Sequence, residues 1–151
     1  PDNILLNSSF ELLRDGWMWR GGVKFVPLQN AFHGSYGIRM ENGGTLFSDF
    51  LPLSLRNDYE LVARVRAVGS RLARVVLGWG DYVNFRGGTD GASREFEVQP
   101  GQWQRVAVTW RPKLTEGQVA PDKPFHAEFG CRSGQIEIDG VEAKAVGGDA
   151  M

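Results

Sequence analysis

Apolar and polar residues alternate with a period of two along most of the chain. Such alternation is typical of a β-strand that buries one face, because successive side chains of a strand point to opposite sides. In the segment 58–68, Leu61 and Val65 fall on one face and Arg64 and Arg66 on the other. The same pattern predicts longer strands over 72–79, 93–98, 103–111, 125–131 and 135–139, and shorter ones over 4–6, 23–26, 36–40, 45–47 and 141–146.

Turn-forming residues separate these segments at intervals of roughly 8–12 residues, which is typical of a sandwich or barrel. Glycine accounts for 20 of the 151 residues, roughly twice its average share. Asn42-Gly43-Gly44 and Ser133-Gly134 are examples of the resulting turn signals. We therefore predict an all-β fold, an antiparallel β-sandwich of the jelly-roll type. Residues 1–147 would form one domain, and residues 148–151 a linker or tail.

The size and charge of the chain restrict its function class. A chain of 151 residues buries one adequate core without obligatory disulfides or metals. Its net charge of −1 argues against a nucleic-acid partner, which requires a basic excess. No apolar run approaches the ~20 residues of a membrane-spanning helix, so we expect no membrane partner, and we expect a monomer. The lone Cys131 excludes an internal disulfide, and the start at Pro1 suggests a piece of a longer protein.

One motif suggests catalysis. The segment Glu137-Ile138-Asp139-Gly140-Val141-Glu142 is similar to the Glu-x-Asp-x-x-Glu pattern of jelly-roll endo-glycanases of family sixteen. There, two carboxylates on one strand face flank the scissile bond, and a bulge at Gly140 would turn Glu137 and Glu142 to the same side. Those enzymes are substantially longer, and only nine residues follow Glu142. We therefore predict no catalysis and keep a small glycanase as an alternative.

Five segments occur in an order that carries a second resemblance. They are residues 3–11 (Asn-Ile-Leu-Leu-Asn-Ser-Ser-Phe-Glu) followed by Gly16-Trp17, then residues 33–39, 58–61, 101–106 and 136–141. Together they resemble carbohydrate-binding modules of families four, sixteen and twenty-two over nearly the whole chain. The closing segment Ile-Glu-Ile-Asp-Gly-Val departs from the family at Gly140, where Asp or Asn is usual. This resemblance also explains the Glu-x-Asp-x-x-Glu match without catalysis.

The resemblance implies a structural calcium ion beside the first and last strands. Glu11 and Asp139 would supply carboxylate oxygens, and backbone carbonyls near Ser9, Gly34 and Tyr36 would complete the shell. Calcium accepts six to eight oxygen ligands of these two kinds. The alternative is that Glu11 and Asp139 are ordinary turn residues.

A sugar-binding surface requires exposed aromatic rings for stacking and polar groups for hydroxyls. Trp19 lies in a glycine-bracketed segment that we interpret as a loop, and Trp79 and Tyr82 lie where a strand ends. These three are our stacking candidates, with packing as the alternative role of each. Trp17, Trp103 and Trp110 fit core positions instead.

The polar candidates are residues expected on the outer faces of strands. They are Arg64, His126 and Glu128, accompanied by Arg66 and Arg74. We expect them on one concave sheet, with a solvated face of Arg–Glu pairs as the alternative. The dense arginines of residues 56–74 would suit uronate or sulfate groups, or simply protect the sheet from edge pairing.

These observations predict a non-catalytic, calcium-stabilised module that binds polysaccharide or oligosaccharide. By the resemblance it would be covalently linked to the catalytic domain of a larger secreted glycan-degrading enzyme, extracellular and bacterial. Its role would be tethering, which raises the local concentration of the enzyme at its substrate. The alternative is an ancillary spacer or interaction domain that binds no sugar.

Overall fold

The computed structural model describes residues 5, 10–11, 16–49, 51–54, 56–81, 93–111 and 122–148. Within them the chain forms eleven strands and no helix, so none of the described residues form a helix that could cross a membrane. The strands are β1 (Trp17–Arg20), β2 (Val23–Pro27), β3 (Tyr36–Glu41), β4 (Thr45–Ser48), β5 (Leu51–Ser54), β6 (Asn57–Ala67), β7 (Ala73–Asp81), β8 (Ser93–Val98), β9 (Gln104–Trp110), β10 (Asp122–Ser133) and β11 (Gln135–Gly148).

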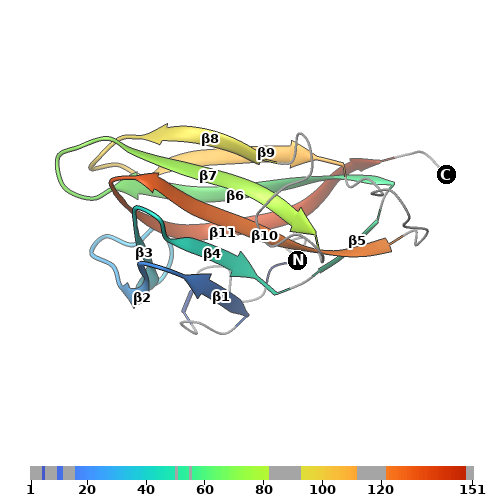
Figure 1. Ribbon diagram of the computed structural model, residues 1–151, viewed down its shortest axis with the longest axis horizontal. Coiled ribbons are helices and arrows are strands. Elements are labelled where there is room, and N and C mark those ends of the chain that lie inside the picture. Colours follow the sequence, from blue (N-terminus) through green and yellow to red (C-terminus); the bar gives the residue numbers. More distant parts are fainter. Residues whose placement is uncertain are drawn as a thin grey trace.

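The strands form two antiparallel sheets that lie face to face (Figure 1). Sheet A has the order β1-β4-β10-β7-β8, with β5 also paired to β10, and sheet B has the order β2-β3-β11-β6-β9. The long strands β6, β7, β10 and β11 run along the length of the molecule, and the short β1 and β2 lie together at one side (Figure 1). The predicted all-β antiparallel sandwich is confirmed.

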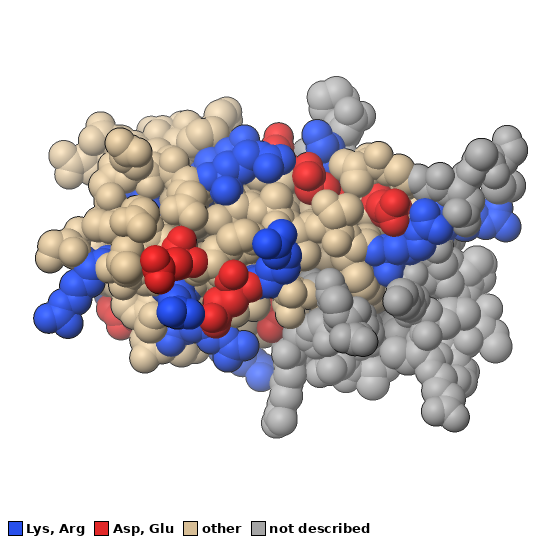
Figure 2. All heavy atoms as spheres, turned by 90° about the horizontal axis from the view of Figure 1, so that it is seen from above, with Lys and Arg blue, Asp and Glu red and all other residues tan. Residues whose placement is uncertain are grey.

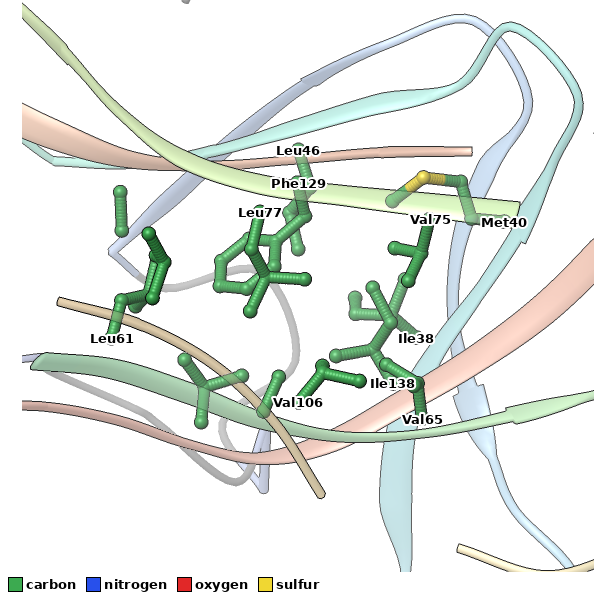
Figure 3. Close-up of a cluster of buried hydrophobic side chains, with 14 of the residues drawn as sticks. Ile38, Met40, Leu46, Leu61, Val65, Val75, Leu77, Val106, Phe129 and Ile138 are labelled. Atoms are coloured by element: carbon green, nitrogen blue, oxygen red, sulfur yellow. The ribbon is translucent and has the colours of Figure 1, made fainter. Parts of the chain in front are cut away.

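The core lies between the sheets, as the period-two pattern predicts. Sheet A contributes inward side chains from β4, β7 and β10, and sheet B contributes them from β3, β6, β9 and β11 (Figure 3). These side chains are at most 1% exposed: Leu46, Val75, Leu77 and Phe129 from sheet A, and Ile38, Met40, Leu61, Val65, Val106 and Ile138 from sheet B.

An aromatic cluster fills one part of this core. It includes Trp79, which we predicted to be exposed for sugar stacking. Trp79 is fully buried rather than exposed, because it shares the inward face of β7 with Leu77. Its ring stacks on Trp110 at 6.5 Å between centroids, and Trp110 meets Phe125 edge-on at 5.0 Å. Trp79 is therefore a packing residue, and no sugar can stack on it in this structure.

Two strands were not expected from the pattern. We interpreted the segment around Trp19 as a loop, but it forms the edge strand β1, whose Trp17 lies opposite Ser48 of β4. The strand β5 pairs with the beginning of β10. Neither four-residue segment is a run of β-branched and aromatic residues between clear turn signals, so pairing with a neighbour decides these two strands.

Charges on the surface seen in Figure 2 are interspersed rather than gathered by sign. Arg74 of β7 pairs with Glu95 of β8 at 3.2 Å, and Arg105 of β9 pairs with Glu60 of β6 at 3.4 Å. Exposed pairs of this kind contribute at most ~1 kcal/mol each. This confirms the solvated Arg–Glu face for Arg74.

Candidate functional site

A groove of about 400 Å³ crosses the outer face of sheet A. The strand register places Arg20 of β1 opposite Thr45 of β4, Thr45 opposite Gly130 of β10, and Gly130 opposite Val76 of β7. These residues form a row across four strands. The described residues that line the groove are Arg20, Asn42, Gly43, Gly44, Thr45, Phe47, Val76, Gly78, Ser93, Glu128, Gly130, Cys131 and Arg132.

The groove exists because glycine occupies outward positions on its floor. Gly130 and Gly78 lie on adjacent strands, each at an outward position, where any other residue would project a side chain. A Cβ atom built on Gly130 meets only the carbonyl oxygen of Gly44, at 3.9 Å, so the space above it is open. Backbone therefore forms the floor, and the flanking side chains form the walls.

Glu128 is the predicted sugar-binding residue that lies in this groove. It stands opposite Phe47 on one side and Gly78 on the other, and its side chain is 15% exposed. Its Oε2 atom lies 3.5 Å from Nε2 of His126. A partly enclosed carboxylate in a groove can accept hydrogen bonds from ligand hydroxyls.

His126 is not a ligand contact, which corrects another prediction. Its side chain has no exposed surface although it points to the outer face of sheet A. Phe47 packs edge-on against the imidazole at 5.2 Å between centroids. His126 therefore lies beside Glu128 and does not line the groove itself.

Two arginines in the groove were missed by sequence reasoning. The guanidinium of Arg20 lies 5.9 Å from the centroid of the Phe47 ring. Arg132 follows Glu128 and Gly130 on the same face of β10, and its side chain is 66% exposed. The period of β10 could have indicated Arg132, whereas Arg20 required recognition of β1 as a strand.

The remaining predicted sugar contacts do not converge on the groove. Trp19 is 38% exposed but lies opposite the buried Leu46, at the edge of sheet A, where its ring meets Phe25 of β2 edge-on at 5.0 Å. Arg64 lies on the outer face of sheet B, over the ring of Phe32 at 4.8 Å. Tyr82 lies outside the described residues. The expectation of one polar face is therefore wrong, because β6 belongs to sheet B and β10 to sheet A.

The carboxylates of the glycanase-like motif are held by arginines on the outer face of sheet B. A register shift in β11 between Asp139 and Glu142 turns Glu142 to the same side as Glu137, as predicted. Glu137 bonds Arg39 at 2.8 Å and Arg66 at 2.7 Å, and its side chain is only 7% exposed. It thus fastens β3 and β6 to β11, and both of its carboxylate oxygens are engaged by arginine.

Arg66 is itself covered by a loop that precedes β3. Its guanidinium lies 4.2 Å from the centroid of the Trp103 ring and donates hydrogen bonds to the carbonyls of Gln29 and Asn30. The Trp103 indole N–H donates to the same Asn30 carbonyl at 2.8 Å. Trp103 therefore anchors this loop on sheet B and is not a core residue of the sandwich.

The structure brings together the two carboxylates predicted to bind calcium. Backbone N–H groups of Ser35 and Tyr36 donate to Glu11 at 2.9 and 2.7 Å, and that of His33 donates to Asp139 at 2.9 Å. Asp139 is fully buried. Its burial raises the pKa of its carboxyl, and the nearby charge of Glu11 adds to this effect. Two acidic groups therefore share the loop between β2 and β3.

The residues at this position fit a calcium ion in part. No Lys or Arg within the described ranges is ion-paired with Glu11 or Asp139, so a cation would relieve their repulsion. The described residues contain no group of three or more His, Cys, Asp or Glu side chains that could hold a metal ion by themselves. Backbone carbonyls would therefore have to complete the shell, and Ser9, one predicted source of a carbonyl, lies outside the described residues.

No protein-family model matches the sequence, and no curated protein matches it. Solved structures do resemble the fold. A Clostridium thermocellum endo-1,4-β-D-xylanase 10B chain with CBM22-1 and GH10 modules, complexed with xylohexaose, superposes with a TM-score of 0.66 at 16% identity. The match covers 100% of this protein but only 30% of that chain.

Two further structures match along nearly their whole length. TmCBM61, in complex with β-1,4-galactotriose, has a TM-score of 0.60 at 19% identity, and the match covers 97% of this protein and 100% of that chain. The Stig cyclase Fisc from Fischerella sp. TAU has a TM-score of 0.68 at 13% identity, with 97% and 98% covered. The protein thus has the β-sandwich fold of carbohydrate-binding modules, a fold that a cyclase shares.

Proposed function

We propose that the protein is a non-catalytic module that binds a glycan chain in the groove of sheet A. The observation that carries this proposal is the glycine-floored groove with Glu128 in its wall. A volume of about 400 Å³ lies within the usual range of ligand sites. The neighbours complexed with xylohexaose and galactotriose support a saccharide as the ligand class.

The groove offers a sugar two kinds of contact, a backbone floor and polar walls. Its floor at Gly78 and Gly130 admits the flat C–H face of a ring close to the backbone. Its walls present the Glu128 carboxylate, the Thr45 hydroxyl and the Ser93 hydroxyl, which can exchange hydrogen bonds with sugar hydroxyls. A long glycan would extend across the strands beyond these contacts.

The wider role follows from the same proposal. Covalently linked to a secreted glycan-degrading enzyme, the module would hold the catalytic domain near its polysaccharide. Such tethering raises the effective concentration of the enzyme without adding a chemical step. The xylanase neighbour, in which a CBM22-1 module shares a chain with a GH10 module, supports this arrangement.

A residue that fills the groove tests the binding site. Gly130→Leu places an isobutyl group in open space without a backbone clash, so it should keep the fold and lower glycan affinity at least about tenfold. Thr109→Leu, at an exposed position of β9 on sheet B, is the matched control. The measurement is affinity electrophoresis against xylan, galactan, glucan and their acidic derivatives, with melting curves for both variants. Binding that survives Gly130→Leu would place the site elsewhere, and absence of any binding by the wild type would favour the spacer domain.

We also propose that Glu11 and Asp139 hold a structural calcium ion. The ion would supply the counter-charge for these two carboxylates and fix the loop that precedes β3. It would lie on the side of sheet B and take no part in the groove of sheet A.

A further inference from the structure

We infer that the groove of sheet A selects glycans that carry anionic groups, carboxylate or sulfate, and that Arg20 and Arg132 recognise the charge. This inference rests on the proposed glycan-binding function and names its substrate class. Neither arginine belongs to the arginine-rich segment 56–74 that the sequence suggested for this purpose.

The balance of charge in the groove favours an anion. Among the lining residues that the structure describes, Arg20 and Arg132 are basic and Glu128 is the single acidic side chain. No acidic residue within the described ranges is ion-paired with Arg20. The nearest acidic partner of Arg132 is Glu95, at 4.0 Å and with both side chains exposed, and such a contact is weak. Both guanidinium groups therefore remain available to a ligand.

The described lining offers little exposed aromatic surface, on which neutral sugars usually stack. Its one aromatic side chain, Phe47, is only 4% exposed, so it offers little surface for ring stacking. Of the three predicted stacking residues, Trp19 and Trp79 lie outside the groove, and Tyr82 lies outside the described residues. A ligand held without aromatic stacking needs stronger polar contacts, and a guanidinium–oxyanion pair is a charge-assisted bond that can be bidentate.

The arrangement of the groups also suits a substituted sugar chain. Glu128 and Gly130 are successive outward residues of β10, with ~7 Å between their Cα atoms, and Arg132 follows at a bulge of the same strand. The open floor at Gly130 thus has a hydroxyl acceptor on one side and a guanidinium on the other. The Phe47 ring beside Arg20 restrains the second guanidinium, which lowers the entropy lost when it binds an oxyanion.

The test compares charged and neutral forms of the same polysaccharide. Polygalacturonate is paired with its fully methyl-esterified form, and a sulfated galactan is paired with its desulfated form. The first pair tests a carboxylate and the second a sulfate as the source of the anion. Wild type, Arg20→Gln, Arg132→Gln and the groove-filling Gly130→Leu are titrated at 50 and 500 mM NaCl. Arg105→Gln is the matched control, because it removes the same charge from an exposed position of sheet B.

We expect wild type to bind at least one charged form about tenfold or more tightly than its neutral partner. Arg20→Gln and Arg132→Gln should each remove most of that preference, Arg105→Gln should not, and high salt should weaken the binding. Equal affinity for charged and neutral forms, lost in Gly130→Leu, would overturn this inference and leave the proposed function intact. If Arg105→Gln reduces the preference for the charged form as much as Arg20→Gln does, the preference comes from the general surface charge. That result would also overturn the inference. No binding of any form would overturn both proposals.

Discussion

At the scale of single residues, two buried or crowded positions show what the fold demands of side-chain chemistry. Gly34 has a positive φ of 66°, and a Cβ atom built on it meets the Glu11 carboxyl carbon at 2.3 Å. Cys131 is 2% exposed and its thiol lies 3.5 Å from the carbonyl oxygens of Ser133 and Gly134. Each of these two positions leads to a prediction about the stability of the protein.

Substitution of Gly34 should be more costly than substitution of a comparable turn glycine. Gly34→Ala combines backbone strain with displacement of Glu11, whereas Gly43→Ala, at φ 89°, has nothing within 4 Å of the new Cβ and carries strain alone. We expect about 1 kcal/mol of destabilisation for Gly43→Ala and about 2–3 kcal/mol for Gly34→Ala, measured by denaturant unfolding. Equal losses would contradict the close packing of Glu11 against this loop.

Cys131 should respond to alkaline pH. Burial raises the pKa of its thiol to about 11, above the value of about 8.5 in an unfolded chain. The folded state then holds the proton more tightly, so its stability falls as pH rises from about 9 to 11. Wild type should lose about 1–3 kcal/mol more than Cys131→Ala over this range, and the native thiol should resist alkylation at pH 8. Rapid alkylation of the folded protein would contradict its burial.

At the scale of elements, the strand period places each side chain on one sheet face, but pairing decides which surfaces are formed. In β7 the period correctly puts Trp79 with Leu77, and the opposing sheet then buries both. In β11 the shift at Gly140 lets Glu137 and Glu142 share the outer face, where Arg66 and Arg64 neutralise them. In this protein, the two glutamates of the glycanase-like motif therefore join β11 to β6.

The different burial of Trp79 and Trp19 predicts losses of stability of different size. Trp79→Ala removes a fully buried indole between Trp110 and Tyr59, so we expect it to cost about 3–5 kcal/mol of stability. Trp19→Ala removes a side chain that is 38% exposed at the edge strand β1, and we expect a cost of about 1–2 kcal/mol. Thermal unfolding of the two variants distinguishes them. Similar small losses would mean that Trp79 is not part of the core.

At the scale of the whole molecule, the two sheets separate two kinds of site. Sheet A carries the open groove on its outer face. Sheet B carries the covering loop, the arginine pairs of Glu137 and the carboxylates Glu11 and Asp139. Ligand binding and metal binding therefore depend on different surfaces and can be tested independently.

Calcium should change the thermal stability of the protein without directly changing the affinity of the groove for a glycan. An ion that binds only the folded state stabilises it by mass action, so a saturating concentration should raise the melting temperature of wild type by several degrees, and a chelator should reverse this. Asp139→Asn should abolish the difference, and Glu142→Gln, an exposed carboxylate of the same strand, should retain it. An identical melting curve with and without chelator, after demonstrated metal removal, would exclude a structural calcium ion.

Much of the architecture was predictable from the sequence because strand periodicity is local. Tyr59, Leu61 and Val65 mark an inward face within a single segment, and the buried core confirms it. Glu11 and Asp139 were predicted together from a family resemblance, and the structure places them near each other. The short strand that contains Trp19 was not predictable, because its pairing partner Leu46 lies 27 residues away in the chain.

The sequence by itself determined an all-β chain, the inward and outward face of each long strand, and the turns between them, since these properties depend on neighbouring residues. Only the tertiary structure decided which strands share a sheet, and hence that Arg64 and Glu128 lie on opposite outer faces. It also decided that Arg20, Gly130 and Arg132 line one groove. The physical reason is that strand order comes from hydrogen bonds and core packing between distant segments, and no local pattern of side chains records those contacts.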